Sequence, residues 1–117
     1  MKHFKMSEFA CPCCGESEMS SDFIADLNFA REIAETPFVI TSGYRCQNHN
    51  AVVGGVASSS HTRGCAVDIK ADNSRHRFLI INSLLQAGFT RLGIADTFIH
   101  VDSDGLKDKE VIWTYGR

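Results

Sequence analysis

Apolar residues recur at helical spacing in two segments of the chain. The first begins after Ser20, a residue type that caps helices, and predicts a helix over about residues 21–35 that ends before Pro37. The second predicts a helix over about residues 75–87, with Gly88 placed to end it. The predicted apolar faces consist of Phe23, Ile24, Leu27, Ala30, Ile33 and Ala34 in the first helix and Phe78, Ile81, Leu84 and Leu85 in the second.

Short runs of β-branched and aromatic residues predict strands between and after these helices. A further short helix is expected near residues 47–53, before Gly54 and Gly55. Strands joined by short loops, with helices before and between them, predict an α+β fold: a small, largely antiparallel sheet flanked by helices. The predicted strands cover residues 38–41, 65–70, 89–94, 97–101 and 111–115.

The length of 117 residues fits a single domain with one core, so we treat residues 1–117 as one domain. Hydrophobic residues make up 44% and charged residues 22%, which is the ordinary globular balance and argues against disorder. Residues 1–19 are expected to form an irregular, cysteine-containing N-terminal arm that Pro12 stiffens and that turns at Gly15.

Charge and hydropathy exclude two classes of function. The formal net charge is -2, without a basic patch, so no nucleic-acid partner is expected. The first residues lack the apolar stretch of a signal peptide, and the longest apolar run, Phe78–Ile81, is far too short to insert in a membrane. We therefore expect synthesis in the cytoplasm without a leader, so that action elsewhere requires release or export by another system.

His61 and Asp68 are the first candidate metal ligands. His61 precedes a turn at Gly64, and Asp68 lies in the predicted strand that follows, so the imidazole can fold back toward the carboxylate. A neutral histidine nitrogen and a carboxylate oxygen are suitable ligands for zinc. A catalytic zinc needs a third protein ligand, for which His100 in a neighbouring strand is the candidate. Spacing alone fits purely structural roles for these residues as well.

Three motifs follow one another along the chain: Ser42-Gly43-Tyr44-Arg45, Ser59-x-His61-x-x-Gly64-x-Ala66-x-Asp68 and Phe98-Ile99-His100-Val101-Asp102. Together they resemble the zinc D-Ala-D-Ala carboxypeptidase family, which also includes phage endolysins that cut the L-Ala-D-Glu bond. The C-terminal Val111-Ile112-Trp113 is typical of the short phage and prophage members.

The resemblance implies a hedgehog-like peptidase fold and a catalytic Zn²⁺ held by His61, Asp68 and His100. It also implies that Arg45 binds or polarises the substrate, with Ser59 as a second substrate-binding candidate. The structural alternatives are a surface ion pair for Arg45 and a backbone cap for Ser59.

The implied activity is that of a metallopeptidase, an endolysin-like peptidoglycan hydrolase that degrades the cell wall at its stem peptide. L-Ala-D-Glu endopeptidase and D-Ala-D-Ala carboxypeptidase activity both fit, and the short, leaderless chain favours the endopeptidase. Zinc would activate water and polarise the scissile carbonyl, and Arg45 could stabilise the oxyanion. The alternative is a non-catalytic zinc domain that binds cell-wall fragments or a partner protein.

The general base is the point at which the chain departs from the resemblance. Many family members carry an acid three residues before the last histidine, where this chain has Thr97. If residues 96–102 are extended, Asp96 and Asp102 both project on the side of His100. We expect catalysis to depend on Asp102, the nearer of the two, rather than on Asp96. The alternative role of Asp102 is to orient the ligand histidine.

The cysteines indicate a second site. Cys11 and Cys14, together with Cys46 and His49, have the C-x-x-C and C-x-x-H spacing of structural zinc sites. A zinc ion there would hold the N-terminal arm against the body of the domain. A disulfide formed after export, or buried thiols that act as small apolar residues, would also fit. Cys65 is expected in the core.

Overall fold

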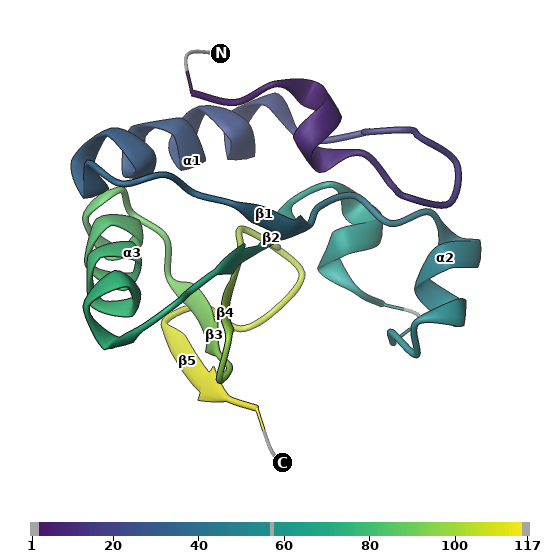
Figure 1. Ribbon diagram of the computed structural model, residues 1–117. Coiled ribbons are helices and arrows are strands. Elements are labelled where there is room, and N and C mark those ends of the chain that lie inside the picture. The colour runs from purple at the N-terminus through teal and green to yellow at the C-terminus, as the bar shows by residue number, and fades with distance from the viewer. Residues whose placement is uncertain (1–2, 57, 116–117) are drawn as a thin grey trace.

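The structure of the protein is a computed structural model, which describes residues 3–56 and 58–115. Its centre is a five-stranded sheet with the order β1-β2-β4-β3-β5 (Figure 1). The strands are β1 (Ile40–Ser42), β2 (Ala66–Lys70), β3 (Arg91–Ile94), β4 (Phe98–Asp102) and β5 (Val111–Thr114). The helices are α1 (Ser21–Ala34), α2 (Gln47–Val52) and α3 (Ser74–Gln86), with short 3₁₀ turns η1 (Met6–Phe9) and η2 (Ser60–Arg63).

The α+β prediction is confirmed, but the sheet is mixed rather than purely antiparallel. Three neighbouring strand pairs are antiparallel, and β5 lies parallel to β3. The reason is connectivity. The chain leaves β4 through a loop and returns in the opposite direction, but β2 and β3 already occupy both edges of β4. The returning strand therefore pairs with the outer edge of β3, whose direction it shares.

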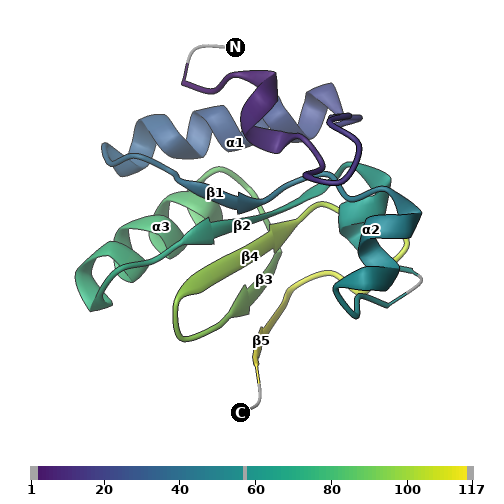
Figure 2. The same cartoon turned by 45° about the vertical axis from the view of Figure 1, so that its right-hand side comes forward.

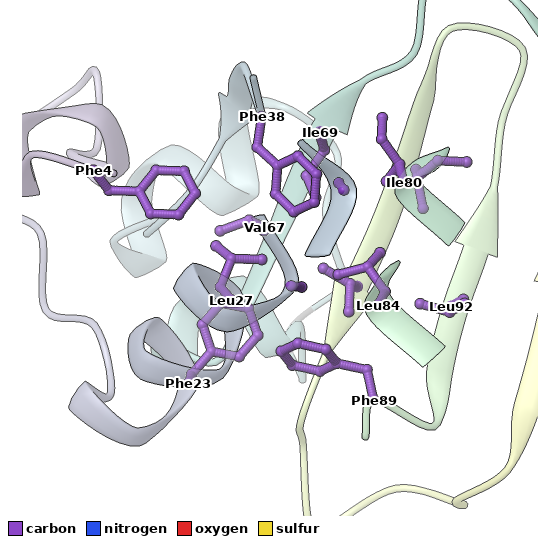
Figure 3. Close-up of a cluster of buried hydrophobic side chains, with 14 of the residues drawn as sticks. Phe4, Phe23, Leu27, Phe38, Val67, Ile69, Ile80, Leu84, Phe89 and Leu92 are labelled. Atoms are coloured by element: carbon purple, nitrogen blue, oxygen red, sulfur yellow. The ribbon is translucent and has the colours of Figure 1, made fainter. Parts of the chain in front are cut away.

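The two faces of the sheet have different chemistry. In β2, Val67 and Ile69 point to the apolar face, whereas Asp68 between them points to the other side. Helices α1 and α3 lie together on one side of the sheet (Figure 2), and Figure 3 shows their side chains meeting those of the strands. The opposite face is thus left for polar residues. The core includes Phe4, Phe9, Phe23, Leu27, Phe38, Ile80, Leu84, Phe89, Leu92, Ile99 and Val101.

The prediction for α1 is confirmed closely. Ser20 caps the helix, because its Oγ accepts a hydrogen bond of 3.3 Å from the backbone N–H of Phe23. The helix ends at Ala34, and its C-cap Glu35, two residues before Pro37, adopts a left-handed conformation with φ 53°. Its buried residues are Phe23, Ile24, Leu27, Ala30 and Ala34.

The predicted apolar face of α3 is wrong for two residues. Phe78 and Leu85 are 59% and 47% exposed, whereas Ile80 and Leu84 are fully buried. Apolar residues lie along two sides of the helix, and the side that packs against the core also contains Ser83. That hydroxyl donates a hydrogen bond of 2.8 Å to the carbonyl of Ile80, which allows a polar residue to be buried. A serine on this side hides it from a search for apolar periodicity.

The N-terminal arm is more firmly anchored than an irregular segment would be. Phe4 and Phe9 lie in the core, and the turn η1 connects them. The backbone N–H of Tyr44 donates to the carbonyl of Phe9 at 2.8 Å. Gly43 packs so closely against this backbone that an added Cβ would lie 2.7 Å from Cα of Phe9. The arm therefore supports the segment that leads into α2. Within the described part of the chain, no helix is long and apolar enough to cross a membrane.

Gly64, which ends η2, provides a test of this packing. Its φ is +70°, and a Cβ there would lie 2.0 Å from the carbonyl oxygen of Glu18. Gly54 has a similar φ of +76° but nothing within 4 Å, so it serves as the matched control. We expect Gly54→Ala to lower the free energy of unfolding by about 1 kcal/mol from backbone strain alone. Gly64→Ala should cost at least about 2 kcal/mol more, because the loop must also move. Urea unfolding measures both, and equal losses would contradict the close packing.

Candidate functional site

Five residues form one row across the sheet, on the face opposite α1 and α3. In the strand registers Ser42 lies opposite Asp68, Asp68 opposite His100, His100 opposite Gly93, and Gly93 opposite Trp113. Directly opposed residues share a face, so the pairing of the strands alone brings Asp68 beside His100. Gly93 leaves space for the indole, since an added Cβ would lie 2.6 Å from Nε1 of Trp113.

His61 reaches this row from the turn η2. The hydroxyl of Ser59 accepts from the backbone N–H of His61 at 3.2 Å and so caps the turn. The imidazole is buried, and its Nδ1 lies 2.8 Å from the carbonyl oxygen of Gly43. Because a carbonyl only accepts, Nδ1 carries the proton and donates. Nε2 is therefore left with a lone pair, 3.3 Å from Oδ1 of Asp68.

His100 is held in a similar way. Its Nε2 lies 2.8 Å from Oδ2 of Asp102, and its Nδ1 lies 2.9 Å from Oδ1 of Asp68. When Nε2–H donates to Asp102, the lone pair on Nδ1 faces the Asp68 carboxylate. Two acceptors at this distance repel each other unless a proton or a metal ion lies between them. The arrangement thus favours a cation at the point where His61, Asp68 and His100 meet.

The three residues fit a zinc ion. One ligand atom from each lies within 4.8 Å of the others. Two imidazole nitrogens and one carboxylate oxygen are a common donor set for catalytic zinc. Bonds of 2.0–2.1 Å in a tetrahedral site separate the ligand atoms by about 3.3 Å, close to the observed 3.3 and 2.9 Å. The ligand set predicted from the sequence is therefore one that this geometry could accommodate, and it stays a prediction.

The electrostatics of the cluster shift the pKa values of Asp68 and His100 in opposite directions. Burial acts to raise the pKa of Asp68, but hydrogen bonds from His100 and His61 outweigh it and lower the pKa from 3.8 to about 2. Burial acts to lower the pKa of His100, but hydrogen bonds to Asp102 and Asp68 raise it above the usual 6.5. Asp68 is consequently a carboxylate at neutral pH, ready to bind a cation.

Asp102 is engaged at both oxygens. Oδ2 accepts from His100, and Oδ1 accepts from Nε of Arg91 at 2.7 Å and from the backbone N–H of Asp104 at 3.1 Å. The side chain is only 1% exposed. A carboxylate that is buried and fully hydrogen-bonded is placed to orient an imidazole rather than to take a proton from water. The geometry therefore favours the orienting role of Asp102 over that of general base.

Asp96 lies away from this cluster. The condition that residues 96–102 are all extended is not met, because β4 begins at Phe98. The preceding residues form the turn from β3, in which the backbone N–H of Ala95 donates to the carbonyl of Phe98 at 3.0 Å. Asp96 is exposed in this turn. Asp102 is among the described residues that line the adjacent cavity, whereas Asp96 is not.

A cavity of about 270 Å³ opens beside the three ligands, and its other walls carry positive charge. Arg45 is fixed by hydrogen bonds of 3.3 Å from Nε to Ser42 and from Nη1 to Asn50, with Nη2 3.9 Å from Oδ2 of Asp68. Ser59 contributes to the wall, in addition to capping η2. The remaining charged and aromatic lining residues are Arg91, Lys107, Phe98, Trp113 and Tyr115.

Sequence analysis missed Arg91 and Asp104. Arg91 hydrogen-bonds Asp102 and places its guanidinium 5.0 Å from the ring centre of Trp113, a cation–π distance. Asp104 is buried and joins the β4–β5 loop to η2, because its Oδ2 accepts from Oγ of Ser60 at 2.7 Å and from Nε of Arg63 at 3.0 Å. The pattern Asp102-x-Asp104 after the motif histidine was visible in the sequence, whereas nothing there marked Arg91.

The predicted second metal site is partly assembled. The sulfur atoms of Cys11, Cys14 and Cys46 come together, but the ring of His49 is not part of that group. Cys65 is half-buried against the core, in line with its expected packing role, and its thiol contacts the carbonyl of Ser60 at 3.7 Å.

Comparison with known families gives one match. The family model described as Peptidase M15 matches residues 2–102, which include all three motifs and the cysteine-containing arm. A search of curated proteins gave no match.

The buried Asp104 generates a pH-dependent prediction. Burial acts to raise its pKa, but hydrogen bonds from Arg63 and Ser60 lower it from 3.8 to about 2. The folded state thus binds the proton less well than the unfolded chain, so the carboxylate stabilises the fold above about pH 4 and loses this effect as the pH falls toward 2. We expect Asp104→Asn to cost about 1–3 kcal/mol at pH 7, and less at pH 3.

Urea unfolding of both proteins across this pH range tests the prediction. Asp72→Asn is the control, since that carboxylate is 56% exposed beside Lys70 and should change stability by less than about 0.5 kcal/mol. If Asp104→Asn lowers the free energy of unfolding by the same amount at every pH, the charge of Asp104 is not what stabilises the fold.

Proposed function

The chain belongs to the peptidase M15 family, and from that membership we propose that it hydrolyses a peptide bond in the stem peptide of peptidoglycan. The observation that carries the proposal is the convergence of His61, Asp68 and His100 beside a positively charged cavity. Zn²⁺ bound there would supply an activated water molecule and polarise the scissile carbonyl.

The protein's own residues would hold and orient the substrate. Arg45 projects into the cavity beside Asp68, fixed by Ser42 and Asn50, so its guanidinium is preorganised to stabilise negative charge on the substrate. Arg91 and Lys107 add positive charge to the walls. Both candidate bonds have a carboxylate on the leaving residue, either the α-carboxylate of D-Glu or the terminal carboxylate of D-Ala. A cationic cavity suits either, and we favour the L-Ala-D-Glu bond and an endolysin-like role.

A second candidate function has a specific observation in its favour. The described lining of the cavity contains two carboxylates, Asp68 and Asp102, and both are engaged with histidines. Thr97, where many relatives carry an acid, cannot act as a base. A zinc domain that binds wall fragments without cutting them would need no base. Catalysis in this chain would instead need water deprotonated by the metal alone, or through groups outside these two carboxylates.

Digestion of purified peptidoglycan separates these functions. We expect the protein to release new termini, identified by mass spectrometry as N-terminal D-Glu for the endopeptidase or free D-Ala for the carboxypeptidase. His61→Ala and His100→Ala should each lose activity and about one zinc per chain, since each removes one of three protein ligands. Wall binding without new termini in the zinc-loaded protein would establish the non-catalytic alternative. Unchanged zinc content in both variants would refute the ligand assignment.

Asp102 and Asp96 give a further prediction. Asp102→Asn should weaken zinc binding about 10–100-fold, because the amide no longer orients His100 as the carboxylate does. Activity should recover when zinc is added to saturation. A loss of roughly 10²–10⁴-fold that persists at saturating zinc would instead identify Asp102 as the general base. Asp96→Asn is the control and should leave zinc affinity and turnover close to those of the wild type, because Asp96 lies in the exposed β3–β4 turn. Chelator competition and wall digestion provide the two measurements.

A further inference from the structure

A second cluster of metal-binding side chains lies between the N-terminal arm and α2. The sulfur atoms of Cys11, Cys14 and Cys46 all lie within 4.8 Å of one another. Cys11 belongs to the arm, whereas Cys46 is the N-cap of α2, 35 residues later. Figure 2 shows the loop of the arm lying next to the start of α2. The cluster therefore joins two segments that are distant in the sequence.

The spacing of the sulfur atoms suits a metal ion better than a disulfide. The sulfurs of Cys11 and Cys46 are 3.7 Å apart, and all five cysteines are free thiols. A disulfide would bring the two atoms to about 2.0 Å. A tetrahedral zinc ion with Zn–S bonds of about 2.3 Å separates its sulfur ligands by about 3.8 Å. The observed distance agrees with the second value.

The backbone of the arm forms a tight turn around Cys11 and Cys14. The N–H of Cys11 donates to the carbonyl of Glu16, and the N–H of Gly15 donates to the carbonyl of Cys11, both at 2.7 Å. Gly15 has a φ of +77°, a conformation that glycine adopts without strain. The turn brings Cys14 back beside Cys11, which is the geometric requirement for a C-x-x-C pair to share one ion.

Backbone donors surround the sulfur atoms. Backbone N–H groups of Cys46, Cys13 and Cys14 point at the sulfur of Cys11. The N–H of His49 donates to the sulfur of Cys46 at 3.3 Å. Such donors stabilise thiolates, which are the form of cysteine that binds metal.

We propose that Cys11, Cys14 and Cys46 bind one structural zinc ion that fastens the N-terminal arm to the start of α2. The ring of His49 and the thiol of Cys13 both lie outside the group formed by these three sulfur atoms. The three cysteines are therefore the protein ligands that the geometry supports.

The proposed zinc site adjoins the segment that carries Arg45 to the cavity. Cys46 directly follows Arg45, which lines the cavity, and the preceding backbone is bonded to the arm through Tyr44 and Phe9. The zinc ion would hold the arm through Cys11 and Cys14 and the start of α2 through Cys46, and would thereby keep Arg45 in its position beside the cavity. Zinc binding at this site does not require the proposed hydrolytic function, because the ion would contact no substrate.

Metal analysis of variants tests the proposal. The wild-type protein, purified under reducing conditions, should hold about two zinc ions per chain, one in each site. Cys14→Ser should remove about one, and so should Cys46→Ser. His61→Ala should remove the other ion and leave the cysteine site filled. Because Cys14 is exposed, its replacement takes no side chain out of the core. Circular dichroism of the variant checks that it is folded. Cys65→Ser is the control thiol and should retain both ions.

Cobalt substitution provides a second readout. Co²⁺ in the His61→Ala protein should show the intense sulfur-to-metal charge-transfer absorption of thiolate ligation, and this absorption should vanish on adding Cys14→Ser. Absence of these bands from the His61→Ala protein would overturn the proposal. So would equal zinc content in Cys14→Ser and Cys65→Ser, or a Cys11–Cys46 disulfide in the reduced preparation.

Discussion

The pairing of β2 with β4 is the constraint on which the site depends. It sets Asp68 opposite His100, and the hydrophobic core fixes it, because Val67, Ile69 and Val101 are fully buried on the other face. A shift of one residue would turn the aspartate toward the core and an aliphatic side chain toward the cavity. Because side chains alternate along each strand, burial of the apolar residues on one face places the polar residues on the other face. Burial of the carboxylate is unfavourable by itself and is offset by the two imidazoles beside it.

Around this pair, each histidine is held through the nitrogen that does not face the metal position. The carbonyl of Gly43 holds His61, and Asp102 holds His100. Asp102 is in turn held by Arg91, which also stacks on Trp113. These contacts fix which nitrogen of each ring carries a lone pair and where it points. A metal ion bound there would therefore meet side chains already in position, beside a cavity whose walls carry Arg45, Arg91 and Lys107.

The segment from Gly43 to Cys46 connects the two clusters of candidate metal ligands. Its carbonyl at Gly43 holds His61, its Arg45 lines the cavity, and its Cys46 belongs to the thiol cluster. The arm packs directly beneath it, since Gly43 touches the backbone of Phe9. A domain of this size has a small core, and a metal ion that ties the arm to α2 would compensate for that.

The sequence by itself indicated the helices, most of the strands and the three residues His61, Asp68 and His100, whose ligand atoms come together in the structure. It could do so because helix caps, alternation and ordered motifs are local or nearly local signals. Only the tertiary structure decided that β5 runs parallel to β3, that Ile80 and Ser83 rather than Phe78 form the packed side of α3, and that Asp96 lies in a turn. The same holds for Arg91, whose bond to Asp102 depends on two strands lying side by side. The strand order, the packed side of α3 and the bond from Arg91 to Asp102 depend on contacts between different elements, and the turn at Asp96 depends on where β3 and β4 stop pairing; spacing along the sequence does not encode these contacts.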